Sequence, residues 1–438
     1  MTATLLGFVV LFTLMGLRVP IAFAMGLVGF AGFGLLVNWG AAAAMVTNTA
    51  YETGLTYSLA VVPLFILMGN LITQAGLSQQ LYAASYALLG HYRGGLAMAT
   101  ILACGGFSAI CGSSLATAAT MAKVSMPSMR KYGYSPSLAG GSIAAGGTLG
   151  ILIPPSVILI IYGLMTEQDI GKLFIAGLLP GILAVVLYLF AIMVVTLIDP
   201  KAGPPGRRQT LRERLRAIKD VWAIGALFLL VIGGIYGGVF TPNEAAGIGA
   251  AGALVIALTR RSLTWRMFFN ILTDTARTTG MVFAVLIGAI VFSNMINMSQ
   301  TPLLLTDWIL AHGFSPLLVI LVIVASYLVL GCVMESMSMI LLTVPVFYPI
   351  IAALDLSFMM PPELVLIWFG IVVVVVTEIS LITPPVGMNV FIIRAVIPDV
   401  STATIYRGVT PFWLVDIVRL ALLVFVPSIS LWLPSMMK

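Results

Sequence analysis

Two pairs of adjacent prolines interrupt stretches that are otherwise apolar enough for a lipid bilayer. They lie in GTLGILIPPSVILIIYG (147–163) and in EISLITPPVGMNVF (378–391). Each pair removes two backbone N–H donors and prevents the preceding helical turn from closing, so carbonyl oxygens upstream lose their partners. Such oxygens can replace the hydration shell of a monovalent cation without any carboxylate. The carbonyls that we expect to be released are those around Gly150, Ile153, Ser380 and Thr383.

A segment of small and hydroxyl-bearing residues precedes each double proline. The first is SAICGSSLAT (108–117) and the second is GCVMESMSM (331–339). Glycine relieves a tight turn, and small residues allow close packing against a broken helix. We therefore expect two helical hairpins whose tips turn inside the membrane, near 105–124 and 330–350. Ordinary packing between membrane helices is the alternative explanation for any single serine.

Four side chains near these motifs are candidates for contact with an anionic solute. They are Ser114, Lys123, Glu335 and Arg394. An ionisable side chain at membrane depth costs roughly 2.5 to 3.5 kcal/mol on insertion scales, so each is a functional hypothesis. Glu335 can instead close its hairpin by hydrogen bonds, and Lys123 can instead extend toward the cytoplasmic surface. The N-termini of half-helices at the breaks would also attract an anion.

The rest of the chemistry-bearing residues are sparse. Cys104, Cys111 and Cys332 lack metal-binding spacing, and the two histidines, His91 and His312, sit in loops. An intramembrane enzyme would need a nucleophile with its base, a pair of aspartates or an HExxH motif. We therefore expect no enzyme. Nucleic-acid binding is also excluded, because the net charge of +6 comes from isolated loop cations.

The elements that must position these residues are membrane helices. Of the 438 residues, 61% are hydrophobic and 8% are charged, and the mean hydropathy is +1.13. A span needs roughly 20 apolar residues, and about 11 to 13 such stretches can be drawn. The sequence thus predicts an all-α polytopic membrane protein.

One basic segment divides the chain into comparable halves. Residues 199–220, DPKAGPPGRRQTLRERLRAIKD, are the longest polar stretch and are cytoplasmic by the positive-inside rule. The predicted units are a first membrane half (1–198), this linker and a second membrane half (221–438). Both halves carry a small-residue segment followed by a broken apolar segment, near 147–163 and 378–394. This order is a weak internal repeat, and matched interruptions of this kind point to a transporter's binding site.

The chain resembles the large membrane subunit of tripartite ATP-independent periplasmic (TRAP) transporters. The matching stretches include VPLFILMGNLI, GHYRGGLAMATILACGGFSAICGSS, AGGTLGILIPPSVILIIYG, LFIAGLLPGIL, GGIYGGVFTPNEAAGIGA and TPPVGMNVF. The resemblance implies two inverted repeats, two re-entrant hairpins with discontinuous helices, and an elevator motion of a transport domain against a scaffold. It implies sodium-coupled import of an organic acid across the bacterial inner membrane. The implied partners are a small four-helix membrane subunit and a periplasmic binding protein.

The resemblance also implies sites for two or more sodium ions. Carried over by position, the first would use Cys111, Ser113, Gly150, Ile153 and Pro155. By repeat symmetry, the second would use Gly331, Val333, Ser380, Thr383 and Met388. The family hairpin often reads Ser-Gly-Ser where this chain has Cys111-Gly112-Ser113. This departure matters only if position 111 contributes its side chain rather than its carbonyl.

Two other transport functions stay open at this point. A stand-alone sodium-coupled carboxylate carrier would work without a small subunit, and an ion channel would conduct without a soluble partner or an ion gradient. The solute is also open, since C4-dicarboxylates, sialic acid, other sugar acids and keto acids are all compatible.

Overall fold

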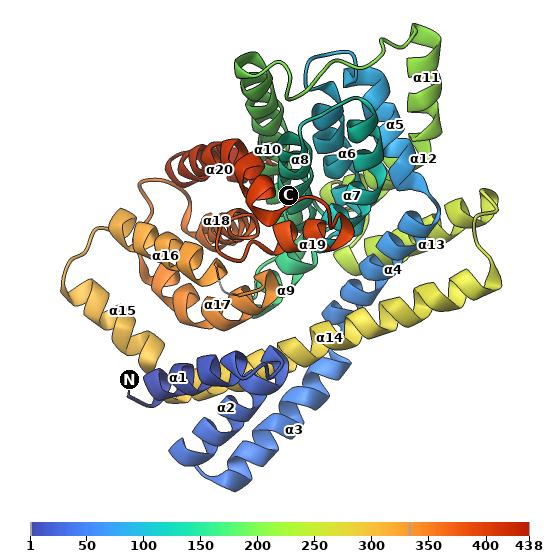
Figure 1. Cartoon of the computed structure of the whole chain (residues 1–438). Coiled ribbons are helices and arrows are strands. Elements are labelled where there is room, and N and C mark those ends of the chain that lie inside the picture. The colour runs from blue at the N-terminus through green and yellow to red at the C-terminus, as the bar shows by residue number, and fades with distance from the viewer. Residues whose placement is uncertain (1, 333, 438) are drawn as a thin grey trace.

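The chain folds into helices joined by short loops (Figure 1). The computed structural model describes residues 2–332 and 334–437, so the predicted ligand Val333 lies outside the described residues. The helices of the first half are α1 (Thr2–Gly16), α2 (Ile21–Leu36), α3 (Trp39–Leu55), η1 (Tyr57–Ala60), α4 (Val61–Gln74), α5 (Leu77–Leu89), α6 (Gly95–Cys111), α7 (Ser114–Lys131), α8 (Pro136–Thr148), η2 (Leu149–Ile151), α9 (Val157–Thr166), α10 (Ile170–Ile198) and α11 (Leu211–Asp220).

The second half is also built of helices joined by short loops. Its helices are α12 (Trp222–Tyr236), α13 (Pro242–Thr259), α14 (Trp265–Met298), α15 (Thr301–Ala311), α16 (Pro316–Gly331), α17 (Ser336–Ala353), η3 (Pro362–Leu364), α18 (Val365–Ser380), α19 (Met388–Val396), α20 (Thr402–Phe425), α21 (Ser428–Leu431) and η4 (Pro434–Met436). No strand occurs in the part of the chain that the structure describes.

The chain is a multi-pass membrane protein. Among the described residues, six helical segments are long and apolar enough to span a bilayer alone: Tyr57–Gln74, Ile170–Ile198, Trp265–Met298, Ser336–Ala353, Pro362–Ser380 and Thr402–Phe425. A seventh results if α11 and α12, bent by 49° at their junction, are counted as one. Several other apolar stretches of the sequence form helices of only 10–17 residues, such as α6, α9 and α16. The apolar stretches therefore outnumber the full-length helices, because glycines and double prolines divide them.

The polar linker ends in a helix. Within 199–220, residues 211–220 form α11, which starts at a capping box in which Thr210 and Glu213 bond each other's backbone N–H groups. No residue of α11 is buried. The proline- and glycine-containing part before it runs over the ends of α5 and α6, where Gly94 N–H donates to Gly203 O and Gly206 N–H donates to Gly90 O.

A peripheral layer of helices lies along one side of the molecule. The long helix α14 crosses this side; in Figure 1 α1 overlaps one of its ends, α2 and α3 lie below it, and α4 and α13 continue the layer. Gly29 on α2 allows the closest approach, since a Cβ at this position would lie 2.6 Å from the backbone nitrogen of Phe292 on α14. Helices in lipid associate through such small residues because their backbones can touch.

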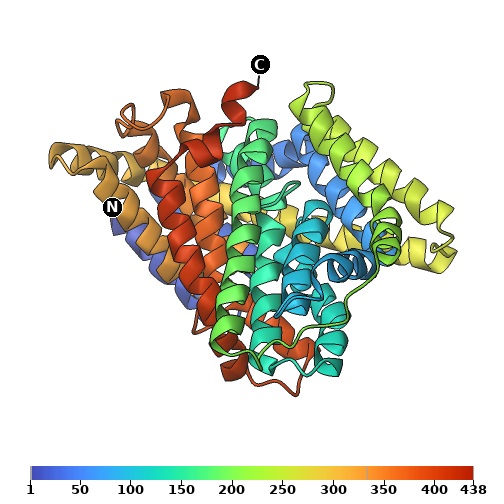
Figure 2. The ribbon, with the colours of Figure 1, turned by 90° about the horizontal axis from the view of Figure 1, so that it is seen from above.

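An inner body of helices packs beside this layer (Figure 2). Both double prolines lie in it, one between α8 and α9 and the other between α18 and α19. Its centre is α8, a helix of small residues that packs on α6, α7 and α20. A Cβ at Gly141 of α8 would overlap the backbone of Gly408 on α20, so these two helices meet backbone to backbone. All residues of α18 except Leu366 are buried, so this helix also lies inside the inner body.

Candidate functional site

The first double proline lies in a segment between two α-helices, residues 149–156, which we call the first break. It follows α8 as the short η2 and ends where α9 begins at Val157. The side chain of Ser156 accepts the N–H of Leu159 at 3.3 Å and donates to the carbonyl of Ile151 at 2.5 Å. Ser156 thus caps α9 and fixes the break against the new helix, as N-terminal serines do.

The first tip, residues 111–116, joins α6 to α7 and touches the first break. Gly112 turns the chain with a φ of +61°, and a Cβ there would lie 2.7 Å from the carbonyl oxygen of Pro155. A Cβ at Gly150 would likewise lie 2.6 Å from the carbonyl oxygen of Ser113. The predicted partners of the first cation site are therefore brought into direct contact, and only glycine fits at two of the contacts.

Carbonyl oxygens at this contact differ in their hydrogen bonding. The carbonyl of Ser113 accepts from the backbone N–H of Thr117 at 3.1 Å and from its hydroxyl at 2.8 Å. By contrast, no donor among the described residues reaches the carbonyls of Ile153 and Pro155, although both residues are buried. Buried carbonyls normally have a partner. The oxygens of Ile153 and Pro155 are thus available to a ligand, and their place in a cation site stays a prediction.

The second break, residues 381–387, lies between α18 and α19 and contacts the end of α16. A Cβ at Gly331, the last residue of α16, would overlap the side chain of Ser380. The thiol of Cys332 donates to the carbonyl of Pro384 at 3.4 Å. The end of α16 is thus packed on the second break, and Met388 starts the helix that follows.

The hydroxyl of Thr383 already has two partners. It donates to the carbonyl of Ile379 at 2.6 Å and accepts from the indole N–H of Trp413 on α20 at 3.0 Å. A cation at the second break would therefore meet backbone oxygens more readily than this side chain. The assignment of Ser380, Thr383 and Met388 to a cation site stays a prediction.

A cavity of about 240 Å³ separates the first tip from the start of α17. It is lined by residues of the first tip, the first break, the α17 N-terminus and helices α4 and α14. These include Cys111, Ser113, Ser114, Ile151, Glu335, Ser336, Asn70 and Thr278. The two small-residue segments that the sequence singled out therefore face each other across one small cavity of mixed polar and apolar lining.

Two roles were considered for Glu335 from the sequence, namely contact with a solute and closing of its hairpin by hydrogen bonds, and its position is compatible with both. Its Oε2 accepts the N–H of Ser338 at 3.1 Å and its hydroxyl at 3.2 Å, so Glu335 caps α17. The same side chain is half-buried and lines the 240 Å³ cavity. A capping carboxylate can still interact with a solute through its other oxygen.

Two predicted substrate ligands do not line this cavity. Lys123 is exposed on the side of α7. The guanidinium of Arg394 donates to the carbonyl oxygens of Pro398 and of Val400, the latter at 2.8 Å. Arg394 therefore closes the loop after its own helix, and its contact with substrate stays a prediction, as does that of Lys123.

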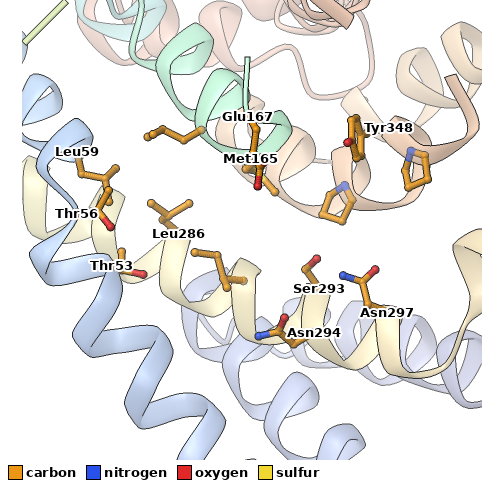
Figure 3. Close-up of a pocket in the computed structure, with 14 residues that line it drawn as sticks. Thr53, Thr56, Leu59, Met165, Glu167, Leu286, Ser293, Asn294, Asn297 and Tyr348 are labelled. Carbon is orange, nitrogen blue, oxygen red and sulfur yellow. The ribbon is translucent and has the colours of Figure 1, made fainter. Parts of the chain in front are cut away.

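A larger cavity of about 490 Å³ opens between the peripheral layer and the inner body (Figure 3). In Figure 3 the side chains of α3 and α14 face those of α9 and α17 across it. Hydroxyl and amide groups dominate its polar lining, and one carboxylate, Glu167, contributes to it. The polar residues are Thr53, Thr56, Glu167, Ser293, Asn294, Asn297 and Tyr348.

Sequence reasoning missed two polar features of the inner regions. Asn70 lines the smaller cavity and donates to the hydroxyl of Thr275 at 3.0 Å. Glu378, Asp416 and Arg419 form a fully buried ionic cluster. The available signal was the same in each case, a polar or charged residue inside an apolar stretch.

The chain is thus a helical membrane protein with two broken segments, the first of which borders a small cavity. A comparison with protein families matches residues 8–429 to the DctM component of tripartite ATP-independent periplasmic transporters. The chain belongs to this DctM family. Because the family consists of transporter components, the prediction that the chain is no enzyme is confirmed.

Characterised relatives cover most of this DctM-family chain. It is 36% identical to the C4-dicarboxylate TRAP transporter large permease protein DctM of Pseudomonas aeruginosa, with 88% of each chain covered. It is 31% identical to the protein of the same description from Vibrio cholerae, with 99% of this chain and 98% of the relative covered. It is 34% identical to the sialic acid TRAP transporter large permease protein SiaM of Vibrio cholerae, with 87% of each covered.

A solved structure shares the fold. The YdaH transporter of Alcanivorax borkumensis matches with a TM-score of 0.61 over 89% of each chain, at 17% sequence identity. At this identity the similarity shows the fold alone. The all-helical membrane architecture predicted from composition is confirmed, and the chain is the large permease subunit of a TRAP transporter.

Proposed function

We propose that this permease imports an organic acid together with sodium ions across the bacterial inner membrane. The observation that carries this proposal is the contact between the first tip and the first break. It leaves the buried carbonyl oxygens of Ile153 and Pro155 without donors, in a break whose residue Ile151 lines the 240 Å³ cavity. Uncharged oxygens in such a position suit a monovalent cation.

The proposed sodium sites follow the two breaks. The first uses oxygens of Cys111, Ser113, Gly150, Ile153 and Pro155. The second uses oxygens of Gly331, Ser380, Thr383 and Met388, with Val333 as predicted from the sequence. Because Ser113 and Thr383 already use their hydroxyls or carbonyls in local bonds, backbone oxygens of the breaks contribute most of each site.

The solute is proposed to be a carboxylate held in the 240 Å³ cavity. Ser114 and the N-terminus of α7 face this cavity, and a helix N-terminus with free N–H groups favours an anion. The relatives named above carry C4-dicarboxylates and sialic acid, both of which are organic acids. These relatives share no single substrate, so the identity of the acid is set by side chains and by the delivering protein.

Coupling follows if sodium stabilises the contact between tip and break. A ligand shifts a conformational equilibrium only by its differential affinity for the two states. Sodium bound between the first tip and the first break would favour the ordered, solute-binding state of the inner body. We propose that the inner body then moves as an elevator against the peripheral layer, with a small membrane subunit and a periplasmic binding protein as partners.

A sodium-specific stability test addresses this proposal without knowledge of the solute. The melting temperature of the purified permease is measured in sodium, potassium and choline chloride at equal ionic strength. We expect sodium alone to raise it, because only a ligand of the folded state stabilises. Equal melting temperatures in the three salts would contradict the proposed sites.

A matched pair of variants locates the effect. Gly150→Ala places a Cβ against the carbonyl of Ser113, whereas a Cβ at Gly225 on α12 has no neighbour within 4 Å. We expect Gly150→Ala to lose the sodium-induced shift and sodium-dependent uptake in proteoliposomes that contain both partners. Gly225→Ala should retain both. Uptake is measured with a C4-dicarboxylate and with sialic acid as separate probes.

A further inference from the structure

The helix of the basic linker, α11, carries a stripe of exposed apolar side chains. Leu211, Leu215 and Ile218 are spaced by four and three residues, which places them on one face of a helix. Their exposed fractions are 73%, 59% and 45%, and Trp222, four residues further on at the start of α12, is also exposed. A continuous row of large apolar side chains along an otherwise polar helix marks an interaction surface.

The charged residues of α11 are distributed regularly around this stripe. Arg212, Arg216 and Lys219 each follow a stripe residue directly, so at about 100° per residue they form a row along one side of it. The two acids of the helix, Glu213 and Asp220, each come two residues after a stripe residue and therefore lie on the opposite face. An apolar stripe flanked by cations, with the acids turned away, is typical of a helix that lies in the interface of a membrane.

These cations have no acidic partner in the protein. Arg212, Arg216 and Lys219 form no ion pair within the described part of the chain. The carboxylate of Glu213 is occupied at the N-terminal cap of the helix. On the other side of the stripe, Nε and Nη2 of Arg214 are shielded from solvent and have no hydrogen-bond partner among the described residues. The surface of α11 therefore carries positive charge that the protein itself does not neutralise.

Neighbouring segments extend this positive charge. His91 lies in the loop after α5, the helix on which α11 packs. Its pKa is lowered below the ordinary value, first by partial burial and then by the charges of Arg214 and Arg208. Arg208 belongs to the chain just before α11. The cations of α11 are thus part of a larger basic surface at the end of α5.

The level of α11 relative to the bilayer is set by its neighbours. Helix α11 turns by 49° into α12, an apolar helix whose Leu229 and Leu230 are exposed. Because α12 lies in the bilayer, the junction of the two helices lies at the level of the lipid head groups. Nη2 of Arg260, at the end of α13, donates to the carbonyl oxygen of Asp220 at 2.9 Å and fixes this junction to the peripheral layer. In Figure 1, α11 lies at the outer edge of the molecule, beside α5 and above α12.

We propose that α11 is a docking surface for anionic phospholipids of the cytoplasmic leaflet. The apolar stripe enters the boundary between head groups and acyl chains, where it is continuous with the lipid-facing surface of α12. Arg212 and Arg216 bind lipid phosphate groups, which match the planar guanidinium, and Lys219 adds a third charge. The stripe alone fits any lipid, whereas the unneutralised cations beside it select an anionic head group. This surface is separate from both breaks and does not depend on coupling to sodium.

Lipid-dependent stability of the purified permease tests the docking surface. The melting temperature is measured in detergent with added phosphatidylcholine or phosphatidylglycerol, since a ligand of the folded state raises it. We expect a larger rise with phosphatidylglycerol in the native permease. The triple variant Arg212→Gln/Arg216→Gln/Lys219→Gln should lose this preference. It should still melt at the native temperature in phosphatidylcholine, because the three positions are exposed.

Two control variants separate the docking surface from net charge. Arg212→Lys/Arg216→Lys keeps the charges and should keep most of the preference for phosphatidylglycerol. Arg18→Gln/Arg277→Gln/Arg407→Gln removes three charges from exposed positions on other segments and should behave like the native permease. A preference that survives in the α11 triple variant, or that is lost equally in the scattered triple variant, overturns the site.

The size of the effect follows from the number of cations. Each cation near an anionic membrane surface strengthens binding by about fivefold, so removal of three should weaken binding of phosphatidylglycerol by about a hundredfold at low salt. Native mass spectrometry of the permease with titrated lipid measures this ratio. In the melting experiment, the native preference should shrink as salt is raised, because exposed charges are screened. Equal affinities of the native permease and the α11 triple variant for phosphatidylglycerol overturn the role of the cations.

Cysteine labelling in proteoliposomes tests which face of α11 the membrane covers. Leu215→Cys lies on the stripe, and Asp220→Cys lies on the opposite face. A membrane-impermeant maleimide applied from the side of the linker should label Asp220→Cys and leave Leu215→Cys unlabelled, with the native permease giving the background of its own cysteines. Equal labelling of both positions overturns the membrane docking. Labelling of Leu215→Cys that disappears only when the small membrane subunit is added assigns the stripe to a protein partner and also overturns the proposal.

Discussion

The side-chain amide of Asn389, on α19, donates to the carbonyl oxygen of Ala144, on α8, at 3.0 Å. These residues are 245 positions apart, and the exposed fraction of Asn389 is 0%. Because α8 leads into the first break and α19 leaves the second, this bond ties the broken segments of the two halves together. The two breaks are therefore linked into one structural unit.

Replacement of Asn389 by leucine should loosen this unit. It removes the donor to a buried carbonyl, and an unsatisfied buried group costs about 1–3 kcal/mol. We expect a lower melting temperature and a smaller stabilisation by sodium. Asn243→Leu is the control, because the amide of Asn243 donates to Tyr57 O at an exposed site. A native melting curve for Asn389→Leu would contradict the tie.

The contact between the first tip and the first break depends on Gly112. Gly112→Ala adds a Cβ 2.7 Å from the carbonyl of Pro155 at a φ of +61°. The left-handed backbone alone costs an L-residue roughly 1–2 kcal/mol. Gly133→Ala has the same backbone cost at a φ of +72°, yet its Cβ would meet nothing within 4 Å.

Sodium-induced stabilisation should distinguish these two alanine variants. Both should lose some thermal stability in potassium chloride, because both carry the left-handed strain. Only Gly112→Ala should also lose the additional shift in sodium, since only that substitution separates the tip from the break. An equal sodium shift in the two variants would place the cation site elsewhere.

Local sequence rules predicted the breaks and the tips because double proline and Gly-Ser act on their own backbone. The contact of Gly112 with Pro155 and of Gly331 with Ser380 followed from expecting each tip to pack on its break. The expected packing of small residues on each break agrees with these contacts, while the assignment of the residues to a site stays a prediction. The position of Asn70 at the 240 Å³ cavity could not be predicted from the sequence, because nothing in its own apolar helix indicates which neighbouring helix it faces.

Side-chain partners between distant segments were not predictable from the chain. Glu378 and Arg419 are 41 residues apart, and only the packing of α18 on α20 brings them to 2.7 Å. Arg394 was a reasonable substrate ligand by type, but its reach to the carbonyl of Val400 depends on the loop path after α19. The sequence gives the type of a polar group, whereas its partner is set by tertiary packing.

The hydroxyl of Thr383 should act mainly by holding Trp413. Thr383→Val removes the acceptor of the indole N–H, and Trp413→Phe removes the donor of the same 3.0 Å bond. We expect each single variant to lower the melting temperature. The double variant should lose less than the sum, with a coupling of about 0.5–1.5 kcal/mol for one hydrogen bond. Additive effects would instead indicate that Thr383 acts independently of Trp413, as a direct ligand would.

An exposed ion pair joins the two halves and contributes a small, pH-dependent stabilisation. Nη2 of Arg130, at the end of α7, lies 2.6 Å from Oδ2 of Asp399, in the loop between α19 and α20. Hydrogen bonds from Arg130 lower the pKa of Asp399 below its ordinary value. A carboxyl with a lowered pKa stabilises the fold above its unfolded pKa, and this contribution disappears as the pH falls through the folded value.

Asp399→Asn and Arg130→Gln should therefore melt slightly below the native protein at neutral pH and low salt, where such pairs are least screened. The difference should vanish in acid below the ordinary Asp pKa and shrink in high salt. A deficit that persists in acid would mean that packing of the Arg130 side chain, rather than its charge, joins α7 to the loop.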